Sequence, residues 1–169
     1  AEKYLKIFNL TGKDVNALHA LTTKQLLDGQ NKLIEQLRNE DGRATPFQPV
    51  VDGTVLPEMP MTAIKKGSAK NIPIMAGTSL DELKMMSVMD PAARNMDETA
   101  MTKKINTLVP AEITTGLVKA YREALKQRGG AITPAEIFGS INTDWMFRIP
   151  TIRLVEMQRD NGMPAYNYL

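Results

Sequence analysis

Residues 70–86, KNIPIMAGTSLDELKMM, carry the clearest structural signal in the chain. Within them, the apolar run Ile72–Ala76 leads into a Gly-Thr pair, which predicts a short buried strand that ends in a turn. Two adjacent carboxylates, Asp81 and Glu82, follow this turn. Because α/β enzymes assemble their sites outside the carboxyl ends of their strands, we expect the chemistry of this chain to lie here.

The length and composition allow one globular domain with a substantial core. The 169 residues are 43% hydrophobic and 24% charged, and the formal net charge is +2. A net charge this small, with the lysines scattered among acids, argues against a nucleic-acid partner. No apolar run approaches the ~18 residues that a membrane-spanning helix requires, so we expect no membrane partner. The first residues lack signal-peptide features; the compartment stays open between cytoplasm and secretion, with the cytoplasm slightly favoured.

The cysteine and histidine counts exclude several kinds of site. The chain has no cysteine and one histidine, His19. Disulfides, a thiolate nucleophile and a zinc site built on several histidines are therefore excluded. His19 lies between Leu18 and Ala20 on an expected helix, where a packing or surface role is preferred to a catalytic one.

Most of the chain is expected to be helical. Apolar residues at helical spacing predict helices over residues 22–37, 97–108 and 110–128, and from Thr143-Asp144 to Asn161-Gly162. Pro150 lies inside the last of these, which predicts a kink or a restart there.

Strand signals are few. Valines lie on both sides of Asp52-Gly53 in FQPVVDGTVLP (47–57), which predicts a hairpin with a tight turn. The last residues, PAYNYL (164–169), resemble the start of a strand. A lone strand cannot satisfy its backbone hydrogen bonds. We therefore expect this chain to be a mostly helical segment of a larger α/β protein, whose remaining sheet lies outside it.

Four segments in order resemble landmarks of the type B carboxylesterases, which are α/β-hydrolases related to the cholinesterases. These segments are FQPVVDGTVLPEMP (47–60), NIPIMAGTSLDE (71–82), TDWMFRIPTIRL (143–154) and GMPAYNYL (162–169). LHALTTKQLL (18–27) is similar to the helical segment that precedes the first landmark. The resemblance implies that residues 1–169 are part of a single hydrolase domain with a partial α/β-hydrolase fold, mostly helical with a few strands of the central sheet.

The resemblance implies a catalytic role for Glu82. In this family the triad is Ser, Glu and His in that chain order, and the Gly-Thr-x-x-Asp-Glu context of the acid matches Glu82. Such a carboxylate fixes the imidazole tautomer and stabilises the imidazolium that forms during attack. From the residues alone, a solvated acid near a helix N-terminus is the preferred interpretation, and Asp81 is the next candidate. Leu83 departs from the glycine usual after the acid.

The other two triad residues are expected outside this chain. The nucleophile should lie upstream, and the histidine shortly after the strand that begins at Ala165. The nearest match to Gly-x-Ser-x-Gly is Gly77-Thr78-Ser79-Leu80-Asp81, which lacks a small residue at its last position. Ser79 is therefore expected to be a turn or cap residue.

Four side chains are candidates for the substrate pocket. The landmark that holds Trp145 and Phe147 can line the acyl pocket in this family, although a helix cap at Asp144 and core aromatics are the preferred alternative. Met85 and Met86 follow the acid closely, with core packing as an equal alternative.

The resemblance implies that the parent protein hydrolyses small-molecule carboxylic esters through an acyl-enzyme, without a metal or an organic cofactor. This segment would supply the triad acid, be inactive alone, and have the remainder of the parent hydrolase chain as its partner. The alternative is a cholinesterase-like binding or adhesion module that has lost catalysis. The presence of Glu82 favours the enzyme, but the deciding serine is not in the chain.

Overall fold

The computed structural model describes residues 1–41, 45–89 and 91–169, which divide into two units, Ala1–Pro57 and Glu58–Leu169. The first unit contains helix α1 (Glu2–Ile7), a 3-10 helix η1 (Val15–Ala20) and helix α2 (Thr23–Asp41). As the periodicity predicts, Leu33 and Leu37 of α2 are buried, and Thr22 and Gln25 form reciprocal capping hydrogen bonds at the start of the helix.

Aromatic residues hold α1 against α2. The hydroxyl of Tyr4 donates to the carbonyl of Leu26 over 2.8 Å, and its ring meets the rings of Phe8 and Phe47 edge to face. Phe8 also lies over Gly29, where a Cβ atom would be 2.3 Å from the Phe8 ring. A glycine in mid-helix is therefore explained by this close approach.

The predicted hairpin over residues 47–57 is wrong, although its turn forms. Asp52 Oδ1 accepts hydrogen bonds from the N–H groups of Thr54 and Leu56, both over 2.9 Å, and Gly53 has a φ of 74°. Residues 45–57 nevertheless contain no strand. Val50 and Val55 are exposed, and two short arms without a further strand or a packed face do not form a stable hairpin.

The second unit holds the remaining elements in the order α3 (Pro60–Lys65), β1 (Ile74–Gly77), α4 (Lys84–Met89), α5 (Pro91–Arg94), α6 (Glu98–Ile105), α7 (Ala111–Gln127), α8 (Pro134–Thr143), a π-helix η2 (Asp144–Arg148), α9 (Ile149–Asp160) and β2 (Ala165–Tyr168). The helices predicted over residues 97–108 and 110–128 are confirmed as α6 and α7. The core lies among α6, α7 and α8 and consists of Met96, Met101, Ile105, Leu125, Ala135, Ile137 and Ile141.

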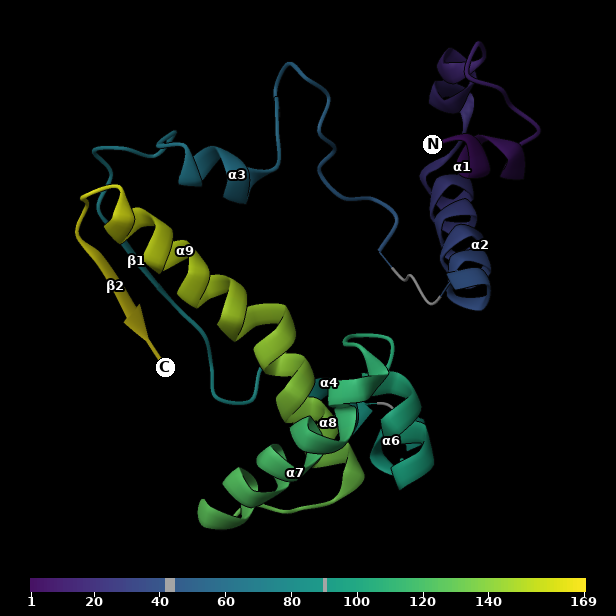
Figure 1. The fold of residues 1–169 in the computed structure, drawn as a ribbon. Helices are drawn as coiled ribbons and strands as arrows, with labels where there is room; N and C mark the ends of the chain where they lie inside the picture. Colours follow the sequence, from purple (N-terminus) through teal and green to yellow (C-terminus); the bar gives the residue numbers. More distant parts are fainter. Residues whose placement is uncertain (42–44, 90) are drawn as a thin grey trace. The chain divides into compact units, whose positions relative to one another are not determined.

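The two strands pair with each other in parallel, from Ile74 opposite Ala165 to Gly77 opposite Tyr168. Figure 1 shows α9 running alongside this pair, with α6, α7 and α8 gathered beyond the start of α9. The strand predicted over Ile72–Ala76 thus exists, but not as a fully buried strand. Met75 is exposed, because the described residues cover one face of this short pair.

The predicted helix start at Thr143-Asp144 is wrong. The chain is helical without interruption from Pro134 to Asp160, and Thr133 caps α8 by accepting a hydrogen bond from the N–H of Glu136. The disturbance expected from Pro150 occurs one turn earlier, as the π-helical turn η2. Proline lacks an N–H and crowds the preceding turn, and the wider π turn accommodates both effects.

None of the helices in the described part of the chain is both long enough and apolar enough to span a bilayer.

Candidate functional site

Glu82 lies in the turn between β1 and α4, at the carboxyl end of the strand. Its side chain is half-buried, and Oε1 accepts a hydrogen bond from the N–H of Ser79 over 2.7 Å. As expected, Ser79 is a turn residue, and its N–H fixes one oxygen of the carboxylate. The second oxygen, Oε2, has no protein donor among the described residues, so it is free to accept a further hydrogen bond.

The residue at position 77 must be small because β2 passes close to it. A Cβ atom on Gly77 would lie 2.5 Å from the carbonyl oxygen of Tyr168 and 2.6 Å from its ring. The N–H of Thr78 then donates to the same carbonyl over 3.3 Å. The start of the turn that carries Glu82 is thus fixed against the end of β2.

Residues 78–83, called the acid loop below, are also held by side chains from α8 and η2. Arg148 Nη2 donates to the carbonyl of Leu80 over 3.1 Å. The N–H of Leu83 donates to Thr143 Oγ1 over 3.3 Å, and Thr143 is buried. The middle and the end of the acid loop are therefore attached to the helical part of the unit.

Asp144 joins this arrangement to α7. Its Oδ1 lies 2.8 Å from Arg148 Nη1, and its Oδ2 accepts the hydroxyl hydrogen of Tyr121 over 2.6 Å. Burial, followed by the hydrogen bond to Asp144, raises the pKa of Tyr121 well above its ordinary value, so this hydroxyl stays a neutral donor. The helix cap expected at Asp144 is not formed, because the chain is helical from Pro134 to Asp160 and no helix begins there. The carboxylate instead binds Tyr121 and Arg148.

Three of the four pocket candidates are exposed in the described chain. Trp145 is 48% exposed, Phe147 37% and Met85 67%, so none of the three lies in the core of the described residues. The side chain of Met86 lies outside the described residues. His19 is exposed on η1 in the first unit, in agreement with a surface role. Within residues 1–41, 45–89 and 91–169, no cluster of His, Asp or Glu side chains could hold a metal ion.

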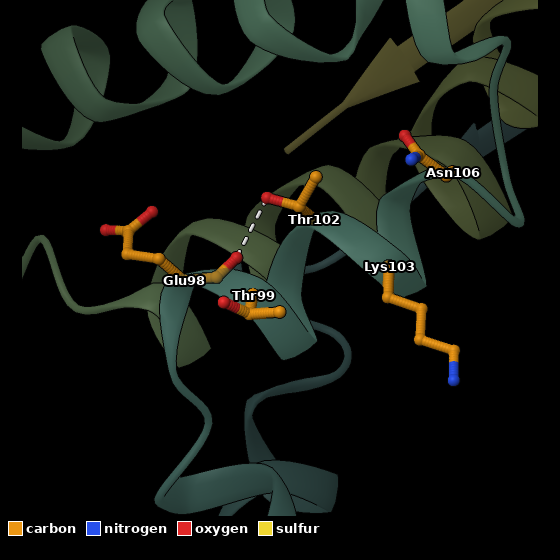
Figure 2. Close-up of a pocket in the computed structure, with 5 residues that line it drawn as sticks. All are labelled: Glu98, Thr99, Thr102, Lys103 and Asn106. Carbon is orange, nitrogen blue, oxygen red and sulfur yellow. Dashed lines mark hydrogen bonds between the residues drawn. The ribbon is translucent and has the colours of Figure 1, made fainter.

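An open hollow on α6 is lined by Glu98, Thr99, Thr102, Lys103 and Asn106. Figure 2 shows that these side chains diverge: Lys103 extends away from Glu98, and Thr102 Oγ1 donates to the backbone carbonyl of Glu98. Glu98 is already paired with Arg122 over 2.6 Å. This hollow does not include Glu82, and its side chains do not converge on a common point.

Sequence reasoning missed Arg148, Tyr121 and Thr143 as neighbours of the acid. The i,i+4 spacing of Asp144 and Arg148 on a helix was the available signal for one ion pair. Nothing local indicated Tyr121, because it reaches Asp144 across 23 residues, from α7, which packs on α8.

Comparison with known proteins places this geometry in a family. The family model described as the carboxylesterase family matches residues 7–169. The crystal structure of the Geobacillus stearothermophilus carboxylesterase EST55 at pH 6.2 is similar with a TM-score of 0.75 and 24% identity, over 99% of this chain and 32% of that chain. The structure of that esterase at pH 6.8 gives a TM-score of 0.67 and 25% identity, over 99% of this chain and 31% of that chain.

This chain therefore spans about a third of the length of the esterase that it resembles. The similarity confirms the predicted fold class: the helices and the parallel strand pair form part of an α/β-hydrolase fold. Since the family model covers all but the first six residues, the chain belongs to the carboxylesterase family.

Proposed function

We propose that the parent protein is a serine carboxylesterase and that Glu82 is the acid of its catalytic triad. Residues 1–169 would form one part of a single hydrolase domain, and the remainder of the parent chain the other. The substrates would be small-molecule carboxylic esters, and the reaction would need no metal or organic cofactor.

The observation that carries this proposal is the position of Glu82 at the shared end of two parallel strands. Because β1 and β2 run in the same direction, Gly77 and Tyr168 end side by side. A histidine that followed β2 in the parent would emerge at this edge, next to the acid loop. Glu82 Oε1 is held by Ser79, which leaves Oε2 to accept the imidazole N–H.

In the proposed reaction, the parent's serine attacks the ester carbonyl while its histidine removes the hydroxyl proton. Glu82 accepts the other imidazole N–H, which fixes the tautomer and stabilises the imidazolium. The imidazolium then protonates the departing alcohol, and water hydrolyses the resulting acyl-enzyme by the same proton route.

We also propose that Trp145, Phe147, Met85 and Met86 border the substrate. Trp145 and Phe147 flank Met146 on η2, the same π-helical turn that contacts the acid loop through Arg148. Their exposure supports this role, since large aromatic side chains on the surface of a described unit are available to line a pocket completed by other parts of the parent.

The test is hydrolysis of a short-chain p-nitrophenyl ester by the full-length parent and its Glu82→Gln variant, with Asp81→Asn as the matched control. Glu82→Gln retains the shape of the side chain but removes its charge. We expect turnover to fall by about a hundredfold or more in Glu82→Gln and by less than about threefold in Asp81→Asn.

The other outcomes are informative too. A larger loss of turnover in Asp81→Asn than in Glu82→Gln would assign the role of the triad acid to Asp81. A folded parent with no hydrolysis of any p-nitrophenyl ester would favour a binding module instead of an enzyme.

A further inference from the structure

At Leu80 the acid loop is attached to the helices through the guanidinium group of Arg148. We propose that Arg148 is a positioning residue for Glu82: with Asp144 and Tyr121, it sets the place of the acid loop relative to the helical core. This inference rests on the proposed function of Glu82 and adds to it the residues that would keep the carboxylate in its productive position.

The guanidinium of Arg148 bridges two elements. Nη1 is 2.8 Å from Asp144 Oδ1 within η2, and Nη2 donates to the Leu80 carbonyl over 3.1 Å. The side chains of Arg148 and Asp144 are only 22% and 18% exposed, so this ion pair is less screened than a surface pair. The planar guanidinium group holds its N–H donors in fixed directions, so it can bind a carboxylate and a carbonyl at once. The ammonium group of a lysine does this less well.

Tyr121 extends the chain of contacts to the core. It lies on α7, whose Leu125 is buried in the core, and its hydroxyl donates to the second oxygen of Asp144 over 2.6 Å. Asp144 therefore has both oxygens occupied, and its rotamer is fixed from two sides. The contacts run from α7 through η2 to Leu80, by way of the partly buried side chains of Tyr121, Asp144 and Arg148.

The contact at Leu80 bears directly on Glu82. Leu80 lies between Ser79, whose N–H binds Glu82 Oε1, and the acid itself, two residues on. A displacement of the Leu80 peptide would move both the Ser79 donor and the backbone of Glu82. Catalytic groups tolerate little displacement: a misplacement of about 1 Å can reduce a rate about a hundredfold.

If the Arg148–Asp144 ion pair had only a structural role, a different result would be expected. Loss of the pair would lower the stability of Arg148 variants but leave the chemistry of the folded enzyme unchanged. The two roles are separated by measuring kcat, KM and the pH profile on folded protein, together with thermal unfolding.

The experiment compares full-length parent enzymes carrying Arg148→Met, Arg148→Lys and Tyr121→Phe. Arg153→Met is the matched control, because Arg153 is an exposed arginine on the neighbouring helix α9. We expect Arg148→Met to lower kcat for p-nitrophenyl acetate by about tenfold to a hundredfold with KM changed less than about twofold. Arg148→Lys and Tyr121→Phe should give smaller losses, and Arg153→Met none.

The pH profile provides a readout that a structural role would not move. A well-placed carboxylate raises the pKa of the histidine that it contacts, and a displaced one raises it less. The acidic limb of kcat/KM should therefore shift to lower pH in Arg148→Met. In a Glu82→Gln background, Arg148→Met should reduce kcat by less than about twofold further, because no charge remains to be positioned.

The failures of the two proposals are distinguishable. Normal turnover in Glu82→Gln overturns the role of Glu82 and this inference with it. Two results overturn this inference alone, provided that Glu82→Gln causes a large loss. One is normal turnover in Arg148→Met. The other is an equal loss of turnover from Arg148→Met in the wild-type and Glu82→Gln backgrounds. Failure of all three network variants to fold would show a structural network and would also overturn it.

Discussion

Gly77 and Tyr168 approach each other so closely that a Cβ atom on Gly77 would lie 2.5 Å from the Tyr168 carbonyl oxygen. The atom in the way is backbone, which cannot move aside without breaking the strand pair. We therefore predict that Gly77→Ala destabilises the parent by about 1–3 kcal/mol, as overpacking typically does. Urea unfolding measures this, with Gly116→Ala as the control, since nothing lies within 4 Å of a Cβ there.

Gln158 holds the segment that leads into β1. The side chain is fully buried, and Nε2 donates to the carbonyls of Ala69 and Ile72 over 2.7 and 2.6 Å. Gln158→Leu would leave both carbonyls without this donor, so we predict a loss of about 2–4 kcal/mol in the free energy of unfolding. A Gln158→Leu parent that unfolds at the wild-type urea concentration would contradict this role.

The turn at Asp52 is expected to depend on pH. Hydrogen bonds from the N–H groups of Leu56 and then Thr54 hold the pKa of Asp52 below its ordinary value of 3.8. Because the folded pKa is lowered, the carboxylate stabilises the turn above pH 3.8, and this contribution is lost as the pH falls through the folded value.

Amide exchange at Leu56 and Thr54 measures the Asp52 effect. Protection should decrease on acidification in the wild type, and this pH dependence should disappear in Asp52→Asn, whose side chain still accepts hydrogen bonds but does not titrate. An Asp52→Asn variant with the same acid-dependent loss of protection would assign the effect to another group.

The isolated chain is predicted to lack esterase activity. Without a nucleophile and a base, acyl transfer loses nearly all of its catalysis, even with the acid in place. The measurement is the rate of p-nitrophenyl ester hydrolysis in three samples. These are buffer alone, the isolated residues 1–169, and residues 1–169 mixed with the separately produced remainder of the parent. Hydrolysis by the isolated chain at a rate that Glu82→Gln abolishes would contradict the prediction.

The helices and the strand positions could be predicted from sequence because their signals are local. Apolar residues at helical spacing indicate α2, α6 and α7. Asp97 is the N-cap of α6, and its side chain accepts a hydrogen bond from the N–H of Ala100 over 2.7 Å. The pattern of a strand followed by a turn likewise predicts a carboxylate at the end of β1.

What could not be predicted depends on contacts distant in sequence. Asp-Gly between valines is a strong hairpin signal, but strands form only where something pairs with or covers them, and residues 45–57 have neither within their unit. Asp144 stands before a helical pattern, which predicts a helix cap, whereas Tyr121 and Arg148 engage its carboxylate. The identity of such partners is set by how α7 packs on α8, just before η2, which no local pattern records.

The parallel pairing of β1 with β2 has a consequence for the order of folding. The paired strands are separated by 91 residues, as between Ala76 and Asn167, and all the helices from α4 to α9 lie in between. Contacts of such long range carry a large loop-closure cost and form late. During refolding of the parent, helix content should therefore recover before esterase activity, because the edge that carries Glu82 closes only after the helices have packed.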